Sequence, residues 1–174
     1  MRSTNRGLTL LELLIVILVL GLLTSAVAPA VGQLVQDHHE TAARNLLVGS
    51  INEARQTSAR LGVPVSLCPS RNGRECSGNA EDWHRGWLVY RQREARGPRD
   101  LFEPDQILRR VDQPIPGLRA NRQVFTLRTD GRRSTNGSFF FCDDSGASER
   151  TVVVNVAGRA RTVTQEDPRS NDRC

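Results

Sequence analysis

Two arginines stand one residue apart near the end of the chain, just after a predicted tight turn. The stretch from Val152 to Val163 reads VVVNVAGRARTV, and its arginines are Arg159 and Arg161. Gly158 lets the backbone approach a phosphate closely. In a regular strand both side chains project from one face, about 7 Å apart, and each guanidinium is a planar donor fork. The pattern favours contact with a phosphate backbone, and the alternative is that these arginines only keep an exposed hairpin soluble.

Other arginines are expected to extend this basic surface. The chain has 174 residues, a formal net charge of +5, and no lysine, so all 24 basic residues are arginines. We expect Arg132 and Arg133 in one loop, and Arg169 and Arg173 in the C-terminal tail, to contribute, with Arg150 as an addition. Such contacts bind nucleic acid weakly, without sequence preference, and with strong salt dependence. Six acidic residues lie nearby in sequence and would neutralise the surface if they share its face: Asp143, Asp144, Glu149, Glu166, Asp167 and Asp172.

The four cysteines follow the apolar N-terminal segment, and an even number in an exported domain indicates two disulfides. Three pairings are open. A local Cys68–Cys76 bridge is the simplest, and it leaves Cys142 with Cys174, which would fix the C-terminal tail to a strand. A zinc site is the alternative, but the chain has no Cys-x-x-Cys and its three histidines lack ligand spacing. We therefore predict no metal and no cofactor.

An enzyme is not expected. The sequence has no nucleophile elbow, no phosphate-binding glycine loop and no metal motif. Glu81, Asp82 and His84 form a small polar cluster beside Trp83, which we interpret as a solvated loop.

The N-terminus predicts a membrane anchor. Residues 1–7 are polar and basic, and residues 8–31 are apolar with one charge, Glu12. Twenty-four such residues are enough to cross a bilayer as a helix, and Arg2 and Arg6 hold the start on the cytoplasmic side. A carboxylate in such a segment is costly. Glu12 either extends to the headgroups or pairs with a cation on a neighbouring subunit.

The helix is expected to continue past the membrane. Residues 32–61 carry an apolar stripe at helical spacing, and Gly62 and Pro64 end it. The stripe is predicted to consist of Leu34, Ala42, Leu46, Ile51, Ala54, Ser58 and Leu61. Residues 62–174 then read as a β-rich domain. Its predicted strands are Val63–Cys68, Gly86–Arg91, Ile107–Val111, Val124–Arg128, Ser138–Cys142, Thr151–Val156 and Arg159–Thr164, with the aromatic residues mostly in the core. A long helix packed on small antiparallel sheets gives an α+β fold class.

The N-terminal segment resembles the class III signal of type IV pilins and type II secretion pseudopilins. Gly7 matches the glycine after which a prepilin peptidase cuts, Leu8 the residue that becomes N-methylated, and Glu12 the glutamate at the fifth mature position. Pro29 matches a kink-forming proline, whereas Leu8 departs from the usual phenylalanine. The resemblance implies a pilin-like fold. A free amine at Leu8 would pair with Glu12 of an adjacent chain, which offsets two buried charges.

Three further stretches resemble GspH/FimT-type minor pilins and pseudopilins. They are CPS…C…W..GWLVY from Cys68 to Tyr90, GRRSTNGSFFFC from Gly131 to Cys142, and TVVVNVAGRAR from Thr151 to Arg161. In the FimT-like branch a Gly-Arg-x-Arg element near the C-terminus binds DNA during natural transformation. Gly158, Arg159 and Arg161 match it position by position, although Gly-Arg hairpin turns also occur among the pseudopilins.

Together these features predict a minor type IV pilin that binds extracellular double-stranded DNA for uptake. The alternative is a minor pseudopilin of a type II secretion system, a structural subunit of the filament tip without DNA binding. Either protein would have one membrane pass in the bacterial inner membrane before assembly and then join a filament, near its tip. The resemblance implies as partners other minor and major pilins, a prepilin peptidase and the inner-membrane assembly platform.

Overall fold

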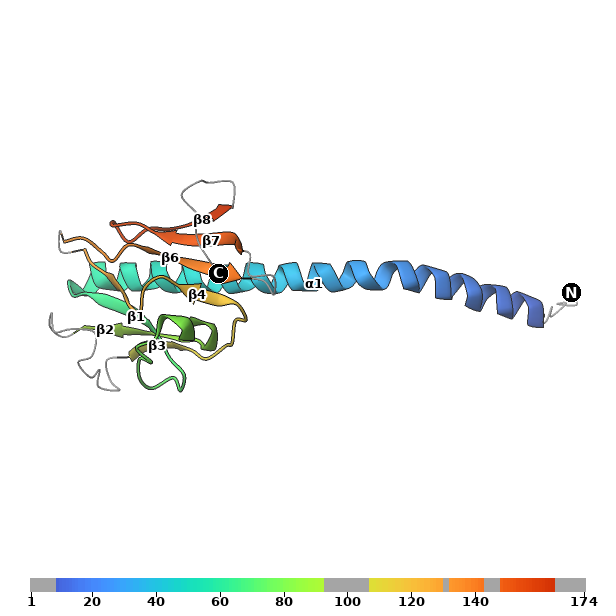
Figure 1. Cartoon of the computed structure of the whole chain (residues 1–174), viewed down its shortest axis with the longest axis horizontal. Helices are drawn as coiled ribbons and strands as arrows, with labels where there is room; N and C mark the ends of the chain where they lie inside the picture. Colours follow the sequence, from blue (N-terminus) through green and yellow to red (C-terminus); the bar gives the residue numbers. More distant parts are fainter. Residues whose placement is uncertain (1–8, 93–106, 130–131, 143–147, 165–174) are drawn as a thin grey trace, which may run out of the picture. The chain divides into compact units, whose positions relative to one another are not determined.

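The structure, a computed structural model, describes residues 9–92, 107–129, 132–142 and 148–164, without the side chains of 26–37, 148–149 and 164. One long helix, α1 (Leu10–Leu61), precedes the β-rich region (Figure 1). The strands are β1 (Val65–Pro69), β2 (Trp87–Arg91), β3 (Ile107–Val111), β4 (Leu118–Ala120), β5 (Phe125–Leu127), β6 (Gly137–Cys142), β7 (Ser148–Val154) and β8 (Ala160–Thr164). A short 3₁₀ helix, η1 (Ala80–Arg85), lies between β1 and β2.

The strands form two antiparallel four-stranded sheets. The first has the order β3-β2-β1-β5 and the second the order β4-β6-β7-β8. The chain changes sheet three times, because β4 enters the second sheet, β5 returns to the first, and β6 enters the second again. This arrangement confirms the predicted α+β class and all seven predicted strands. β4 and η1 were not predicted.

The main hydrophobic core lies within residues 43–174, which form one compact unit. Its helical contributions are Ala43, Leu47, Ile51 and Ala54, and its strand contributions come from both sheets. At its centre the rings of Trp83, Phe125 and Phe139 touch, with the two phenylalanine rings stacked at 4.3 Å. The expectation of core aromatics is confirmed for Trp83, Trp87, Tyr90, Phe125, Phe139 and Phe141, whereas Phe102 lies outside the described residues.

The buried stripe of α1 differs from the predicted one. Ile51, Ala54 and Ser58 are buried as expected, but Ala42 is exposed, Leu46 is only half-buried, and Leu61 is exposed at the helix end. The buried apolar positions earlier in the helix are Ala43 and Leu47, each one residue after the predicted position. The spacing of four residues from Ala43 to Leu47 and Ile51 keeps one face against the sheets. Leu34, which was also predicted for the stripe, is among the residues whose side chains the structure does not describe.

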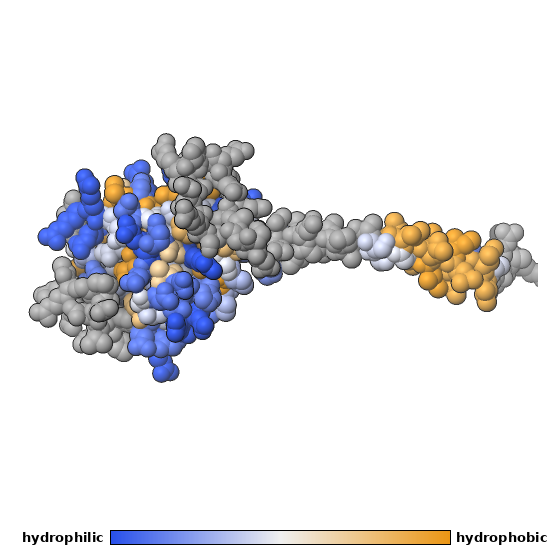
Figure 2. All heavy atoms as spheres, viewed as in Figure 1, coloured by the Kyte–Doolittle hydropathy of each residue, from blue (hydrophilic) through white to orange (hydrophobic). Residues whose placement is uncertain are grey.

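The N-terminal part of α1 is apolar on its surface. Between residues 10 and 23 the leucine, isoleucine and valine side chains are about half or more exposed, and Figure 2 shows this segment in orange. Within the part of the chain that the structure describes, no helix satisfies both the length and the hydropathy needed for a membrane span. The predicted span over residues 8–31 extends beyond those residues at Leu8 and includes side chains from 26 on that are not described, so it stays a prediction.

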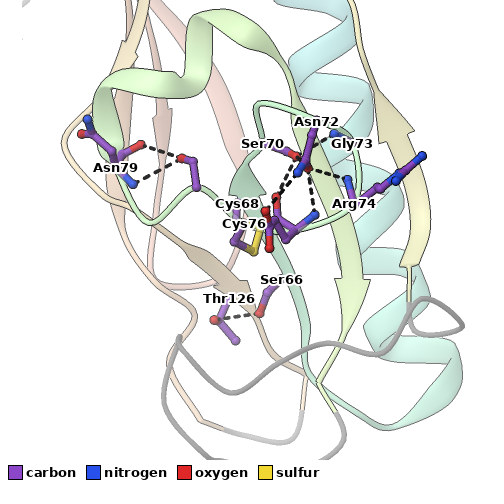
Figure 3. The surroundings of a disulfide bond; sticks show 11 residues. Ser66, Cys68, Ser70, Asn72, Gly73, Arg74, Cys76, Asn79 and Thr126 are labelled. Atoms are coloured by element: carbon purple, nitrogen blue, oxygen red, sulfur yellow. Dashed lines mark hydrogen bonds between the residues drawn. A yellow bond between two sulfur atoms is a disulfide. The ribbon is translucent and has the colours of Figure 1, made fainter.

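A disulfide closes the loop after β1. Cys68 and Cys76 are bonded with an S–S distance of 1.96 Å, so the local bridge predicted from the sequence is present (Figure 3). Within the loop, the Oδ1 atom of Asn72 accepts hydrogen bonds from the backbone N–H groups of Arg74 and Glu75. Cys142 is also disulfide-bonded. Its predicted pairing with Cys174 remains a prediction because Cys174 lies outside the described residues.

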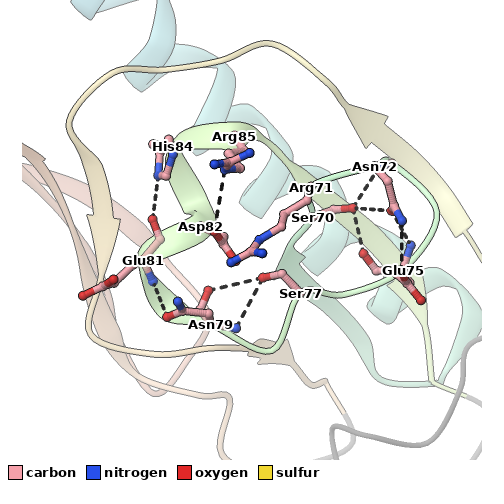
Figure 4. Close-up of polar contacts among 11 residues, drawn as sticks. Ser70, Arg71, Asn72, Glu75, Ser77, Asn79, Glu81, Asp82, His84 and Arg85 are labelled. Carbon is pink, nitrogen blue, oxygen red and sulfur yellow. Dashed lines mark hydrogen bonds and ion pairs between the residues drawn. The ribbon is translucent and has the colours of Figure 1, made fainter.

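The polar cluster beside Trp83 lies on a 3₁₀ helix rather than a loop, and it is only partly solvated as we expected, because Glu81 is exposed and His84 is half-buried but Asp82 is buried. Asp82 belongs to η1 and is only 3% exposed. Its carboxylate contacts Arg71 Nε at 2.8 Å and Arg85 Nε at 3.8 Å (Figure 4). Burial raises the pKa of Asp82, but the hydrogen bonds from Arg71 and Ser77 and the two arginine charges outweigh it, so the pKa lies below its ordinary value of 3.8. A buried carboxylate is tolerated here because Arg71 and Arg85 compensate its charge, whereas a buried carboxylate without such partners would be strongly destabilising.

This site predicts an acid-sensitive contribution to stability. Because the native pKa of Asp82 is lowered, the unfolded chain binds more protons at low pH, and the free energy of unfolding falls as the pH drops below 3.8 towards the native pKa. Asp82→Asn should lower the free energy of unfolding at neutral pH by about 1–3 kcal/mol and flatten the acid limb of its pH profile. Urea unfolding of a fragment beginning near residue 36 measures both. Parallel wild-type and variant profiles would contradict the prediction.

Candidate nucleic-acid interface

The hairpin between β7 and β8 closes in a tight, fully hydrogen-bonded turn. The N–H of Gly158 donates to the carbonyl of Asn155 at 2.9 Å, and the N–H of Asn155 donates to the carbonyl of Arg159 at 3.1 Å. The side-chain oxygen of Asn155 accepts from the N–H groups of Ala157 and Arg159, both at 3.0 Å. Gly158 has φ +69°, the left-handed conformation that closes a three-residue hairpin loop with a bulge. We call residues 155–161 the arginine turn.

The arginine turn is held from two sides by distant parts of the chain. From α1, Arg55 Nε donates to the carbonyl of Ala157 at 3.1 Å. From the segment before β6, the N–H of Ser134 donates to the carbonyl of Val156 at 2.9 Å. Gly158 is buried between them, because a Cβ there would lie 3.1 Å from Ser134 Oγ and 3.5 Å from Arg55 Cδ. The turn is therefore fixed rather than free in solution.

The two arginines of the motif face solvent from this fixed turn. Arg159 and Arg161 are both exposed. In the sheet register Arg161 is opposite Val153, and Ala160 between the two arginines packs against the core. Neither guanidinium makes a hydrogen bond or ion pair with another residue in the described ranges. Strand alternation places both side chains on the face away from the core.

A second arginine pair adjoins the arginine turn. Arg132 and Arg133 are exposed and directly precede Ser134, which is bonded to the turn. The fold thus brings together four of the six arginines predicted for the site. Arg150 does not join Arg161: it is two residues from core residue Val152 along β7, on the opposite face from Val153.

Several predicted contributors cannot be placed. Arg169 and Arg173 lie outside the described residues, as do all the neighbouring acidic residues except Glu149, whose side chain is also not described. At the processing site, Gly7 and Leu8 lie outside as well. Glu12 is exposed in the first turn of α1, where its N–H donates to Thr9 Oγ1 at 3.3 Å. Within the described residues no cluster of His, Cys, Asp or Glu could hold a metal ion.

Sequence reasoning missed Arg55. The sequence pattern predicts only an ordinary polar residue at this position of α1. Nothing near it in the sequence indicates contact with a turn 102 residues later. A bulky arginine next to the core position Ala54 carries no specific sequence pattern. Only the packing of α1 beside the hairpin shows this contact.

Comparison with protein-family models shows the family to which the domain belongs. The model described as type II transport protein GspH matches residues 43–158, more than half of the chain. The chain belongs to the GspH family. A second model, the prokaryotic N-terminal methylation motif, matches residues 2–28. The GspH match includes Gly158 but ends before Arg159 and Arg161.

Solved structures agree on the fold. The type IV minor pilin FimU of Pseudomonas aeruginosa strain PAO1 matches in two crystal forms. One has 17% sequence identity and a TM-score of 0.50, covering 80% of this chain and 94% of FimU. The other has 16% identity and a TM-score of 0.49, covering 77% and 96%. No curated protein matches the chain. At this identity the similarity shows the pilin-like fold alone.

Membership in the GspH family makes the protein a minor pilin or pseudopilin, a structural protein rather than an enzyme. The methylation motif implies a prepilin peptidase as processing partner, insertion in the inner membrane before assembly, and other pilins as neighbours afterwards.

Proposed function

We propose that this GspH-family protein is a minor type IV pilin that binds extracellular double-stranded DNA without sequence preference, for uptake in natural transformation. The binding surface is the arginine turn with Arg132 and Arg133 beside it. The observation that carries the proposal is the pair Arg159 and Arg161, both exposed and without a side-chain partner among the described residues, on a turn fixed by Arg55 and Ser134. Because the backbone of the turn is already fixed, it needs no further ordering when the arginines bind phosphate.

The N-terminal segment completes the proposal. Residues 1–7 are a leader that the peptidase removes after Gly7, residues 8–31 span the membrane with the N-terminus in the cytoplasm, and residues 32–61 continue the helix into the domain of residues 62–174. After assembly near the filament tip, the methylated amine of Leu8 pairs with Glu12 of a neighbouring subunit. Arg169 and Arg173 add to the basic surface through the Cys142–Cys174 bridge.

One observation favours a second function. The GspH family model carries a type II transport description, and its match ends at Gly158. The arginines of the motif thus lie outside the part of the chain that defines the family. The second candidate function is therefore that of a minor pseudopilin of a type II secretion system, in which Arg159 and Arg161 contribute only solubility.

DNA binding decides between these functions. We expect the full-length protein in a non-ionic detergent to bind a labelled DNA duplex in fluorescence anisotropy, more weakly as the salt rises from about 50 to 200 mM. Arg159→Ala/Arg161→Ala should weaken binding by about tenfold and lower the slope of log K against log salt by roughly 1.8, because two phosphate contacts are lost.

The matched control removes two positive charges elsewhere. Arg74→Ala/Arg110→Ala also replaces two exposed arginines, and neither side chain makes a hydrogen bond or ion pair with a described residue. This variant should bind DNA nearly as the wild type does. Equal losses in both double variants would mean that net charge alone drives binding. A folded wild-type protein that does not bind would favour the pseudopilin.

A further inference from the structure

Arg55 is half-buried beside the arginine turn, and its guanidinium is only partly used. Its Nε–H is bonded to the carbonyl of Ala157. The two terminal nitrogens carry four more N–H groups, and they make no hydrogen bond or ion pair with a residue in the described ranges. Its partner among the described residues is a neutral carbonyl, and no carboxylate in the described ranges forms an ion pair with it.

The contact also fixes where these remaining donors lie. The stem of Arg55 packs at Gly158, since a Cβ at that glycine would be 3.5 Å from Arg55 Cδ. A guanidinium is planar and rigid, so one bond through Nε sets the orientation of the terminal nitrogens. Ala157, the bonded residue, is two positions before Arg159. A charged donor pair is thus held beside the backbone of the turn that carries the two exposed arginines.

We propose that Arg55 is a further phosphate-binding arginine beside the arginine turn, and that it uses Nε to hold the turn and its terminal nitrogens to bind a DNA phosphate. The inference rests on the proposed DNA-binding function and extends its surface from the hairpin onto α1. Hydrogen bonds between a guanidinium and a phosphate are charge-assisted and often bidentate. A free terminal pair in a fixed plane fits that geometry.

A purely structural role for Arg55 makes a different prediction. If Arg55 only anchors the turn, its loss weakens binding by loosening Arg159 and Arg161, but the number of neutralised phosphates is unchanged. If Arg55 contacts a phosphate itself, its loss also lowers the salt dependence, because each phosphate contact contributes about 0.9 to the slope of log K against log salt. The salt slope therefore separates the two roles.

The test uses the full-length protein in non-ionic detergent and a labelled DNA duplex. Arg55→Gln should lower the affinity about two- to fivefold and the salt slope by about 0.9. Ser134→Ala is the matched variant, because it removes a hydroxyl that packs under Gly158 and accepts from the N–H of Arg128 at 3.0 Å, and it leaves every arginine in place. It should lower the affinity with the wild-type slope. An Arg55→Gln protein with the wild-type slope overturns the inference.

A second measurement observes Arg55 directly in the wild-type protein. The Nε–Hε signal of Arg55 in the NMR spectrum of the wild type can be assigned by its absence in Arg55→Lys. DNA should shift this signal with the same midpoint as the anisotropy titration, and a signal that stays in place overturns the inference. If Arg159→Ala/Arg161→Ala lowers the slope but Arg55→Gln does not, the inference alone fails. If the wild type does not bind DNA at all, the proposed function fails with it.

Discussion

Trp83→Ala is expected to lower the free energy of unfolding by about 3–5 kcal/mol. Trp83 is fully buried, and its ring contacts Trp87, Phe125 and Phe139 at centroid distances of 6.5, 5.9 and 4.8 Å. It also donates a hydrogen bond from Nε1 to the carbonyl of Arg122 at 2.9 Å. Truncation leaves a large cavity and an unpaired carbonyl in the centre of the core. Since a domain is stable by only about 5–15 kcal/mol, the loss would remove much of its stability.

Urea unfolding of a fragment beginning near residue 36 measures this loss, because every residue of the main core lies after residue 42. Trp83→Phe is the informative control. It keeps an aromatic ring but cannot donate to Arg122, so it should cost about 1–3 kcal/mol. If the alanine and phenylalanine variants are equally stable, the hydrogen bond rather than the ring packing is the main contribution of Trp83, against our expectation.

Gly86→Ala is expected to cost about 3 kcal/mol or more, because the backbone there excludes a side chain in two ways. Gly86 ends η1 with φ +127° and ψ −179°, a conformation that only glycine adopts readily. A Cβ at this position would also lie 2.1 Å from the carbonyl oxygen of Val111, a strand backbone atom that cannot move aside without breaking β3. We expect the variant to lose the pairing of β2 with β3.

Gly78→Ala separates these two effects. Gly78 has φ +71°, but a Cβ there would meet no atom within 4 Å. Its replacement therefore carries only the conformational cost, about 1 kcal/mol. The two variants should differ clearly in urea unfolding, and hydrogen exchange at β3 should rise only in Gly86→Ala. Similar stabilities for both would show that the backbone of Val111 yields to the new side chain.

The pattern of apolar residues and the turn residues between them were enough to predict seven of the strands, because each of those strands packs at least one face on a core, and β1 and β2 are buried on both faces. β4 was missed for a physical reason. It is three residues long, and Pro114, Pro116 and Gly117 come just before it, which is the composition of a loop. Only its pairing with β6, Leu118 opposite Phe141, makes it a strand. Similarly, the burial of Asp82 follows from Arg71, eleven residues earlier, and not from its own neighbours.

The candidate site likewise could be predicted only as far as it depends on residues close together in the sequence. The Gly-Arg-x-Arg pattern is local, so the sequence indicates the turn and the common face of Arg159 and Arg161. The anchors are not local. Arg55 reaches the turn across 102 residues, and Ser134 reaches it from another loop. Long-range contacts of this kind leave no periodic pattern, and a single sequence cannot show them.

The order of the strands has a consequence for folding kinetics. β6, β7 and β8 are consecutive in the chain and adjacent in their sheet, so this meander forms through local contacts. The first sheet pairs β1 with β5, where Ser66 meets Thr126 across 60 residues, and such distant pairing is slow. The arginine turn can therefore close early as a hairpin, yet it gains its anchor on Arg55 only after α1 docks. The basic surface takes its final shape late, so under the proposed function the binding of a polyanion would report that the whole domain has folded.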